Sequence, residues 1–304
     1  MSAALALRRR SEPAGGAAIE SIELPAVRRR IIRYYEETQP FYDLFWTEAH
    51  TRSMNYGLWN STTFTRRRAF ENQNRAIAAA LRVDVADVVL EAGCGTGGTT
   101  VWLAAEYGVR AVGITLCRNQ VERAARIAAR RGLAGRARFL VMDFMHTAFR
   151  DGRFTKLFAS ESACYAPSKA GFLREAHRLL RPSGRIVVID GFLADGPRSA
   201  AEDRLLAECS HGWAVPGLAA VTEFADALAA AGIRDIAFAE CTPTIMPSAR
   251  RIWGRAVLAL PVARMLHACG ALSDGQLAHV RASIRQLLVL RRGLAVYGIF
   301  SAAR

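Results

Sequence analysis

Residues 88–98 read Val-Val-Leu-Glu-Ala-Gly-Cys-Gly-Thr-Gly-Gly, and this stretch decides the fold. A β-branched run leads directly into a glycine-rich turn, and a helical pattern follows. Gly93, Gly95 and Gly97 allow backbone conformations closed to other residues, and they let a ligand approach without a Cβ in the way. Read as Gly93-x-Gly95-x-x-Gly98, the stretch also fits the dinucleotide fingerprint. The motif alone therefore predicts a nucleotide-containing ligand of either kind.

Two further positions separate these ligands. Glu91 precedes the first glycine, and a carboxylate there suits a cationic ligand better than a pyrophosphate. The second apolar run ends in Thr115, whereas an NAD site has an acidic ribose ligand at that place. Both positions argue against NAD.

The pattern beyond this motif alternates short β-branched runs with helical segments, which is typical of a parallel sheet built from βαβ units. Strands are expected at 88–91, 110–114, 137–141, 157–160, 185–190, 233–239 and 294–300, and helices at 97–107, 119–131, 169–180 and 222–231. We therefore predict the α/β class: a doubly wound, mostly parallel seven-stranded sheet of Rossmann-like type, with a final hairpin and a helical cap.

The predicted domain organisation has five parts. They are a flexible or partner-docked arm (1–27), an N-terminal cap segment (28–75), the core (76–242), a lid insertion (243–290) and the final strand (291–304). The arm could support a homo-oligomer. The stretch 28–60 is rich in aromatic residues, which suits either a packed core or the wall of a ligand pocket.

Composition limits the partners of the chain. The formal net charge is +14, which raises nucleic acid or an anionic membrane surface as possible partners, but arginine supplies nearly all of it and the basic clusters are scattered. Solvated helix faces explain them better, so no nucleic-acid partner is expected. The six cysteines lack metal-ligand spacing, and no apolar run reaches the ~18 residues of a membrane span. We expect no metal, no integral membrane association and a cytoplasmic location.

Five motifs in order make the pattern specific. They are Glu91-Ala-Gly-Cys-Gly-Thr-Gly97, Gly113-Ile-Thr-x-x-x-x-Gln120, Asp143-Phe144, Glu161-Ser162 and Leu180-Arg-Pro-Ser-Gly184. This series resembles the class I S-adenosylmethionine-dependent methyltransferases, in particular the sterol and tocopherol C-methyltransferases and the cyclopropane fatty acid synthases. The resemblance covers residues 31–302 and departs at Ser183, where the family usually has glycine. It implies S-adenosyl-L-methionine as the cofactor.

The resemblance also implies a set of cofactor-binding residues. Gly93, Gly95 and Gly97 would pack on the methionine and ribose moieties, and Thr115 and Gln120 would bind the ribose. Asp143 and Phe144 would contact the adenine, and Ser53 and Tyr56 would close over the methionine end. Glu91 and Ser160 would complete the set. Each has a structural alternative: Thr115 could end a strand, Asp143 could cap a turn, and Gln120 could be an exposed helix residue.

Candidate catalytic residues lie near the end of the fourth expected strand. Glu161 follows that strand directly and could stabilise a cation or accept a proton, although it could also be an acid at a helix N-terminus. Tyr165 shares the same edge. His211, beside Trp213, is a second candidate base, and a surface-loop histidine is the alternative.

The function that these observations favour is methyl transfer to a lipophilic small molecule. C-methylation of an isoprenoid- or sterol-like specialised metabolite fits the subgroup motifs and the apolar cap. An N- or O-methyltransferase of a specialised small molecule is the alternative.

Overall fold

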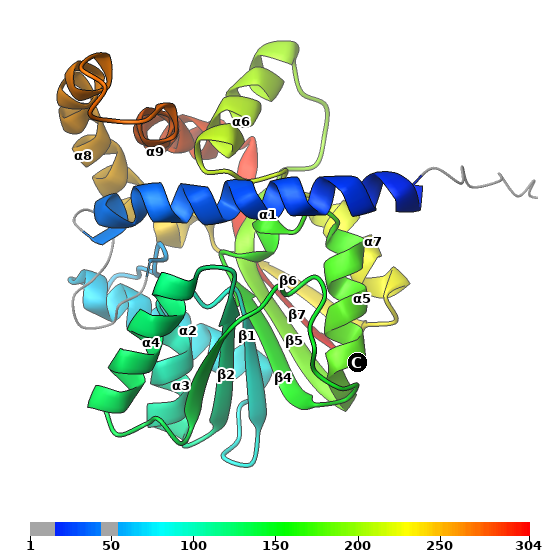
Figure 1. Cartoon of the computed structure of the whole chain (residues 1–304). Helices are drawn as coiled ribbons and strands as arrows, with labels where there is room; N and C mark the ends of the chain where they lie inside the picture. Colours follow the sequence, from blue (N-terminus) through cyan, green and yellow to red (C-terminus); the bar gives the residue numbers. More distant parts are fainter. Residues whose placement is uncertain (1–15, 44–53) are drawn as a thin grey trace, which may run out of the picture.

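The computed structural model describes residues 16–43 and 54–304, and its centre is one seven-stranded sheet (Figure 1). The strands are β1 (Val88–Ala92), β2 (Arg110–Thr115), β3 (Ala137–Val141), β4 (Phe154–Ser160), β5 (Leu180–Leu193), β6 (Arg234–Glu240) and β7 (Ala295–Ala303). Their order is β3-β2-β1-β4-β5-β7-β6, with β7 antiparallel to both of its neighbours and the other pairs parallel. The predicted fold class is confirmed.

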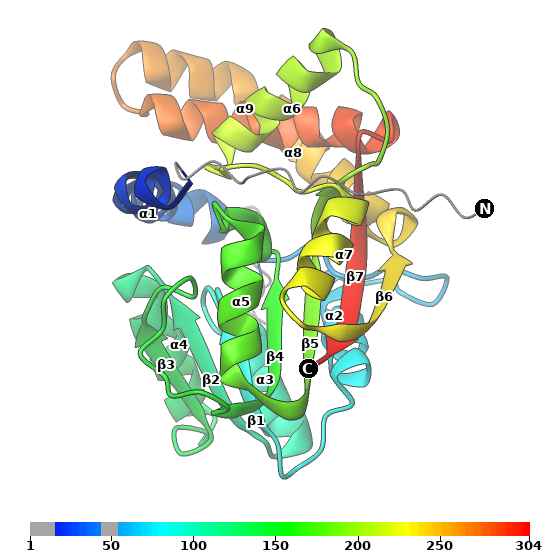
Figure 2. The same ribbon diagram turned by 90° about the vertical axis from the view of Figure 1, so that its right-hand side faces the viewer.

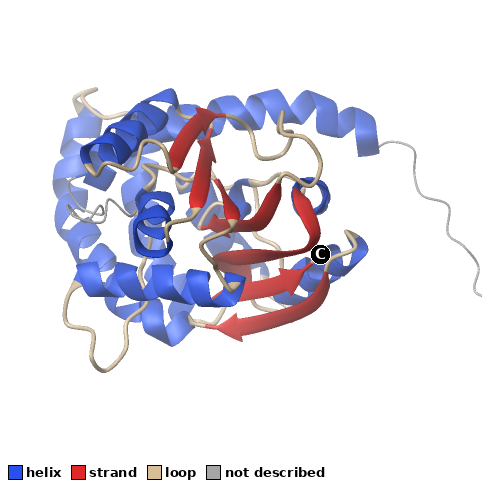
Figure 3. Cartoon of the chain, turned by 90° about the horizontal axis from the view of Figure 1, so that it is seen from below, coloured by secondary structure: helices blue, strands red, loops and turns tan. Residues whose placement is uncertain are grey.

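Helices cover both faces of the sheet, as the view from below shows (Figure 3). On one face α2 (Arg66–Leu81), α3 (Gly98–Tyr107) and α4 (Arg118–Arg130) pack on alternate strand residues such as Val89 and Phe158. On the other face α5 (Lys169–Leu179) and α7 (Val221–Ala230) pack on the intervening residues, such as Leu90 and Leu157. This period of two is what a parallel sheet buried on both faces requires.

The strand order reverses at β1, since β2 and β3 follow on one side and β4 and β5 on the other. At such a switch point the connections after neighbouring strands diverge and leave a crevice at the carboxyl edge, where ligands bind in open α/β sheets.

A cap lies above this edge (Figure 2). It consists of α1 (Gly16–Phe41), α6 (Ala200–Gly212), α8 (Thr242–Ala268) and α9 (Asp274–Arg291). Helix α9 is in contact with the other three. The boundary that we expected at residue 27 falls inside α1, because 16–41 form one uninterrupted helix.

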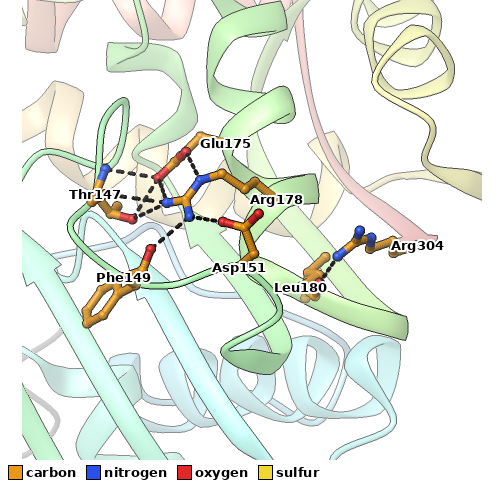
Figure 4. A network of polar contacts seen from close by, with 7 residues as sticks. All are labelled: Thr147, Phe149, Asp151, Glu175, Arg178, Leu180 and Arg304. Carbon is orange, nitrogen blue, oxygen red and sulfur yellow. Dashed lines mark hydrogen bonds and ion pairs between the residues drawn. The ribbon is translucent and has the colours of Figure 1, made fainter.

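A polar network attaches α5 to the loop after β3 (Figure 4). Arg178 donates to Glu175, to the carbonyl of Phe149 and to Asp151, and Glu175 accepts from the backbone N–H of Thr147. The guanidinium group thus joins this loop to α5 by charge-assisted hydrogen bonds.

Three features differ from the sequence predictions. Helix α6 was missed, although Ser199 and Glu202 form a capping box at its start. Strand β5 begins at Leu180, before the expected 185, and its pairing with β4 is irregular between Phe154 and Lys156. Strands β6 and β7 are antiparallel, but α8 and α9 separate them in the chain, so they do not form a tight hairpin.

Candidate active site

A cavity opens at the carboxyl edge of the sheet. The ends of β1, β2, β3, β4 and β5 line it from below, and α1, α6 and α9 line it from the cap. Residues far apart in the sequence, from Val27 to Tyr297, therefore share one space.

The glycine-rich turn after β1 forms part of the floor. Gly93 and Gly95 have φ angles of 80° and 50°, and both line the cavity. A Cβ on Gly93 would lie 2.4 Å from the Cβ of Ser162, and one on Gly95 would lie 2.7 Å from Cε of Met54. Both positions thus require glycine and keep the floor open to a ligand.

Gly97 has other surroundings than Gly93 and Gly95. It does not belong to the cavity lining, and a Cβ there would lie 2.6 Å from Cε1 of Phe139 and 2.8 Å from Cβ of Ala124. The requirement for glycine at this position comes from the close packing of the turn on β3 and α4. The contact of Gly97 with the cofactor stays a prediction.

Glu91 joins β1 to the first turn of α3. Its Oε2 accepts hydrogen bonds from the backbone N–H of Thr100, at 3.0 Å, and from the Thr100 hydroxyl. Burial raises the pKa of Glu91 to about 8. The carboxyl group also lines the cavity, and its burial favours the neutral form.

The polar residues at the ends of β2 and β3 meet α1. Oγ1 of Thr115 donates to Oε1 of Gln120 at 2.8 Å, and Nε2 of Gln120 donates to Gln39 at 3.4 Å. Gln120 is only 1% exposed, which excludes the alternative of a solvent-facing helix residue. Oδ1 of Asp143 accepts from the N–H of Met145 at 2.8 Å, as the turn-capping alternative requires.

Asp143 also forms an ion pair through Oδ2 with Nε of Arg28, on α1. Phe144 lines the cavity beside it and packs edge-on against Phe172. The first cap helix therefore lies directly over the polar groups that the sequence predicts to bind adenine and ribose.

Glu161 lies where the polar floor meets the cap. Its Oε1 accepts from the hydroxyl of Tyr297 at 2.6 Å and from the N–H of Tyr56 at 3.0 Å. Burial raises the pKa of Glu161 to about 7, against the lowering effect of these hydrogen bonds. The carboxyl group can therefore gain or lose a proton near neutral pH.

Ser160 precedes Glu161 and is 7% exposed. Its Oγ accepts hydrogen bonds from the side-chain amides of Gln73, at 3.1 Å, and of Asn55. These contacts anchor the segment after residue 54 to the end of β4. Ser160 and Tyr56 both line the cavity, as predicted cofactor neighbours should.

Aromatic and aliphatic side chains form the upper half of the cavity. The ring centroid of Tyr35 lies 5.8 Å from that of Tyr165 and 5.9 Å from that of Tyr42. The hydroxyl of Tyr165 donates to the carbonyl of Trp213 at 3.1 Å, which fixes its ring. Apolar residues of α6 and α9 complete this wall: Leu206, Val289 and Leu290.

Comparisons with known proteins agree with this arrangement. Residues 90–188 match a family described as Methyltransferase domain. The chain is 29% identical to tocopherol O-methyltransferase, chloroplastic, of Arabidopsis thaliana over 78% of its length and 72% of that enzyme. It is 29% identical to sterol 24-C-methyltransferase of Eremothecium gossypii over 68% of its length and 57% of that enzyme.

Among solved structures, the cyclopropane synthase MmaA2 from Mycobacterium tuberculosis has the same fold, with a TM-score of 0.78 at 15% identity. The match covers 91% of this chain and 98% of that one. The chain is an S-adenosylmethionine-dependent methyltransferase with the class I fold. Family, enzyme class and cofactor are confirmed.

The cavity of this methyltransferase has the groups that S-adenosylmethionine needs. Gly93 and Gly95 leave a floor free of Cβ atoms, and Thr115, Gln120 and Asp143 supply polar atoms beside it. Three groups lie side by side in the order of their strands in the sheet. They are the glycine turn after β1, the residues predicted to bind ribose at the end of β2, and the residues predicted to bind adenine after β3. The residue-level assignments remain predictions.

The structure does not bring every candidate to this methyltransferase cavity. His211 lies in the last turn of α6, is exposed, and does not belong to the cavity lining. Helix α6 directs His211 outward, while Cys209 and Ser210 line the cavity, so the structure does not support His211 as a base. Ser53 lies outside the described residues.

Other residues of the site were missed. Asp190, at the end of the fifth expected strand, is buried and lines the cavity, and burial raises its pKa. Its position at a strand end was a usable signal. Tyr297 and Gln73, by contrast, lie on a strand and a helix that look like ordinary core.

Two features are absent from the described residues. Within them, no group of three or more His, Cys, Asp or Glu side chains could hold a metal ion. None of the helices in 16–43 and 54–304 combines the length and apolar character needed to cross a bilayer.

Proposed function

We propose that this methyltransferase methylates a carbon atom of a lipophilic, isoprenoid- or sterol-like acceptor. One observation carries the proposal: Glu161 is the carboxyl group at the border between the polar floor and the aromatic wall. The names of two relatives, a tocopherol O-methyltransferase and a sterol 24-C-methyltransferase, support an acceptor of this class.

The upper half of the cavity suits such an acceptor. Its lining is aromatic and aliphatic, from Tyr35, Tyr42 and Tyr165 together with residues of α9. Burial of apolar surface would supply most of the binding free energy, at about 25 cal/mol per Å². The cap would also exclude water from the reacting atoms.

When bound, S-adenosylmethionine supplies an electrophilic methyl group carried on a sulfonium. A carbon–carbon double bond of the acceptor that receives this methyl becomes a carbocation. Aromatic faces and a carboxylate stabilise such a charge. Tyr35, Tyr165 and Glu161 offer both kinds of group within one cavity.

Glu161 would then complete the reaction. Its ionised carboxylate would accept the proton lost from the carbon next to the cation, and the electron pair of that C–H bond would restore a double bond. The hydrogen bonds from Tyr297 and Tyr56 hold the carboxylate in place. A pKa of about 7 allows Glu161 to release the proton afterwards.

Heteroatom methylation is the second candidate. One relative carries the name of an O-methyltransferase, and a carboxylate with a pKa of about 7 could also take the proton of a hydroxyl group. In that case Glu161 would act before or during methyl transfer.

Product analysis with a labelled methyl donor tests the proposal. Extracts rich in isoprenoids and sterols would be incubated with the enzyme, and the labelled product would be examined by NMR. A new methyl group on carbon supports the proposal. Label on oxygen or nitrogen would replace it with the second candidate, and labelling confined to water-soluble products would contradict the lipophilic acceptor.

A further inference from the structure

Helix α8 exposes an unusual amount of apolar surface. Eleven large hydrophobic side chains are exposed in the described part of the chain, and six of them lie on α8: Trp253, Val257, Leu258, Val262, Met265 and Leu266. Leu258 is 81% exposed, Met265 59% and Val262 54%. Exposed apolar patches of this kind mark interaction sites more often than scattered single residues do.

The helical period places the three most exposed of these side chains on one face. Leu258, Val262 and Met265 follow the spacing i, i+4, i+7, which places them in one row along the helix. The opposite face, with Ala256 and Ala263, is buried against α9. The outward apolar row is therefore additional to the face that holds α8 on the protein.

The charged residues of the helix are all positive. Four arginines, at 250, 251, 255 and 264, are its charged residues, and positions 241–273 contain no Asp or Glu. All four are exposed, and Arg251 lies over the ring of Trp59. Arginines beside exposed apolar side chains on one helix are typical of segments that lie in the interface of an anionic membrane.

We propose that the outward face of α8 binds the surface of an anionic lipid bilayer, with its apolar row in the upper acyl region and its arginines among the lipid phosphates. A bilayer matches both features, since its acyl region accommodates the apolar row and its phosphates attract the arginines. A second copy of the chain fits less well. Across a two-fold axis α8 would face α8, and the arginines would meet like charges without acidic partners on that helix.

This surface adjoins the acceptor half of the cavity. Figures 1 and 2 place α8 and α9 together, on the far side of α1 from the sheet. Helix α9 lines the cavity with Gln286, Val289 and Leu290. If the acceptor is lipophilic, as proposed above, it could reach the cavity from the bilayer with little exposure to water. The docking itself does not depend on that acceptor.

The test is binding of the full chain to vesicles, so it is independent of methyl transfer. Flotation with vesicles of phosphatidylcholine alone or mixed with phosphatidylglycerol should show binding to the mixed vesicles, and raised salt should weaken it. The triple variant Leu258→Gln, Val262→Gln, Met265→Gln should lower the partition coefficient about tenfold or more. Arg250→Gln and Arg264→Gln should each lower it roughly fivefold, from about 1 kcal/mol per arginine.

Matched controls are Val85→Gln, in the turn before β1, and Leu140→Gln, in the edge strand β3, because both side chains are exposed and apolar but lie away from α8. They should bind as the wild type does. Calorimetry with S-adenosylhomocysteine would show that every variant is folded. The proposal is overturned if the wild type does not bind anionic vesicles, or if the α8 variants bind them as well as the controls do. It is also overturned if the triple variant only converts a dimer into a monomer.

Discussion

Glu161 has a φ angle of 52°, in a region that residues other than glycine rarely occupy. Such a backbone costs roughly 1–3 kcal/mol, so its surroundings must hold it in place. The Glu161 N–H donates to the carbonyl of Ile189 at 2.8 Å, and Tyr297 and Tyr56 hold the carboxyl group. Strain of this kind at a strand end in the cavity supports a functional role for the side chain.

Replacing Glu161 by glutamine tests that role. Glu161→Gln keeps the size of the side chain and removes its negative charge, so kcat should fall by about 10²-fold or more. Affinity for S-adenosylhomocysteine should change little. Glu106→Gln, on the exposed side of α3, is the matched control and should behave as the wild type. Steady-state kinetics and calorimetry measure both effects, and unchanged turnover would exclude Glu161 from catalysis.

The pH dependence of kcat gives a second test at the same residue. Burial raises the pKa of Glu161 to about 7, and the ionised form is the one that stabilises a cation or accepts a proton. We therefore expect kcat to rise with pH through about 7 and then level off. In Glu161→Gln this rise should disappear. A rise that persists in the variant would belong to another group.

At the scale of elements, the turn between β1 and α3 lines the cavity from the sheet, and helix α1 lines it from the cap. The turn is fixed by positive φ angles and by Glu91, whose carboxyl group binds Thr100. Helix α1 is tied to α9 through Glu37, which accepts from Ser273 at 2.6 Å through its side chain and from Gln276 at 2.9 Å through its carbonyl. The floor is thus part of the core, whereas α1 belongs to the cap.

A substitution in the turn should distinguish the loss of cofactor binding from the effect of backbone strain. Gly95→Val should abolish measurable binding of S-adenosylhomocysteine, because its side chain would enter the cavity next to Met54. Gly132→Val is the matched control, since Gly132 also has a positive φ angle but has no atom within 4 Å of a built Cβ. Both variants carry backbone strain, and only the first should lose binding in calorimetry. Retained affinity in Gly95→Val would show that this turn does not contact the ligand.

Hydrogen exchange should reveal the motion of the cap. Binding of S-adenosylmethionine with an acceptor analogue should slow amide exchange in residues 28–41 and 274–290, because lids that enclose a reactive group close over it. Helix α5, which is attached through Arg178 and Glu175, should exchange at the same rate in both states. Unchanged protection in both cap segments, measured by mass spectrometry, would contradict a mobile lid.

At the scale of the whole molecule, the sheet order sets where all these groups meet. The reversal at β1 brings the ends of β2 and β3 to one side of the turn and those of β4 and β5 to the other. The ends of these five strands and the cap therefore line one cavity. Binding at such a site stabilises the entire folded state.

Thermal unfolding should report this linkage. At a concentration of 100 times its Kd, S-adenosylhomocysteine should raise the free energy of unfolding by about 2.7 kcal/mol. For a chain of 304 residues this corresponds to a rise in Tm on the order of 4 °C. NAD at the same concentration should leave Tm unchanged. A rise with NAD alone would contradict the cofactor assignment.

The sequence by itself determined the class of the sheet, the glycine turn and the family. These depend on local period and on motifs whose order follows the chain, and such patterns are readable without contacts. Strand β3 was predicted with its exact bounds for this reason. The capping box of α6 was also readable, but the segment lacked a clear helical period and was missed.

Only the tertiary structure decided which side chains meet. Tyr297 and Glu161 are 136 residues apart, and neither position indicates the other in the sequence. His211 is exposed because the direction of α6 turns it to solvent, and Gly97 packs against residues of β3 and α4. The shifted pKa of Glu161 likewise comes from burial, which is a property of the packed cap and sheet together. Motifs state which residue types are present, whereas packing of distant segments decides their distances, their exposure and therefore their chemistry.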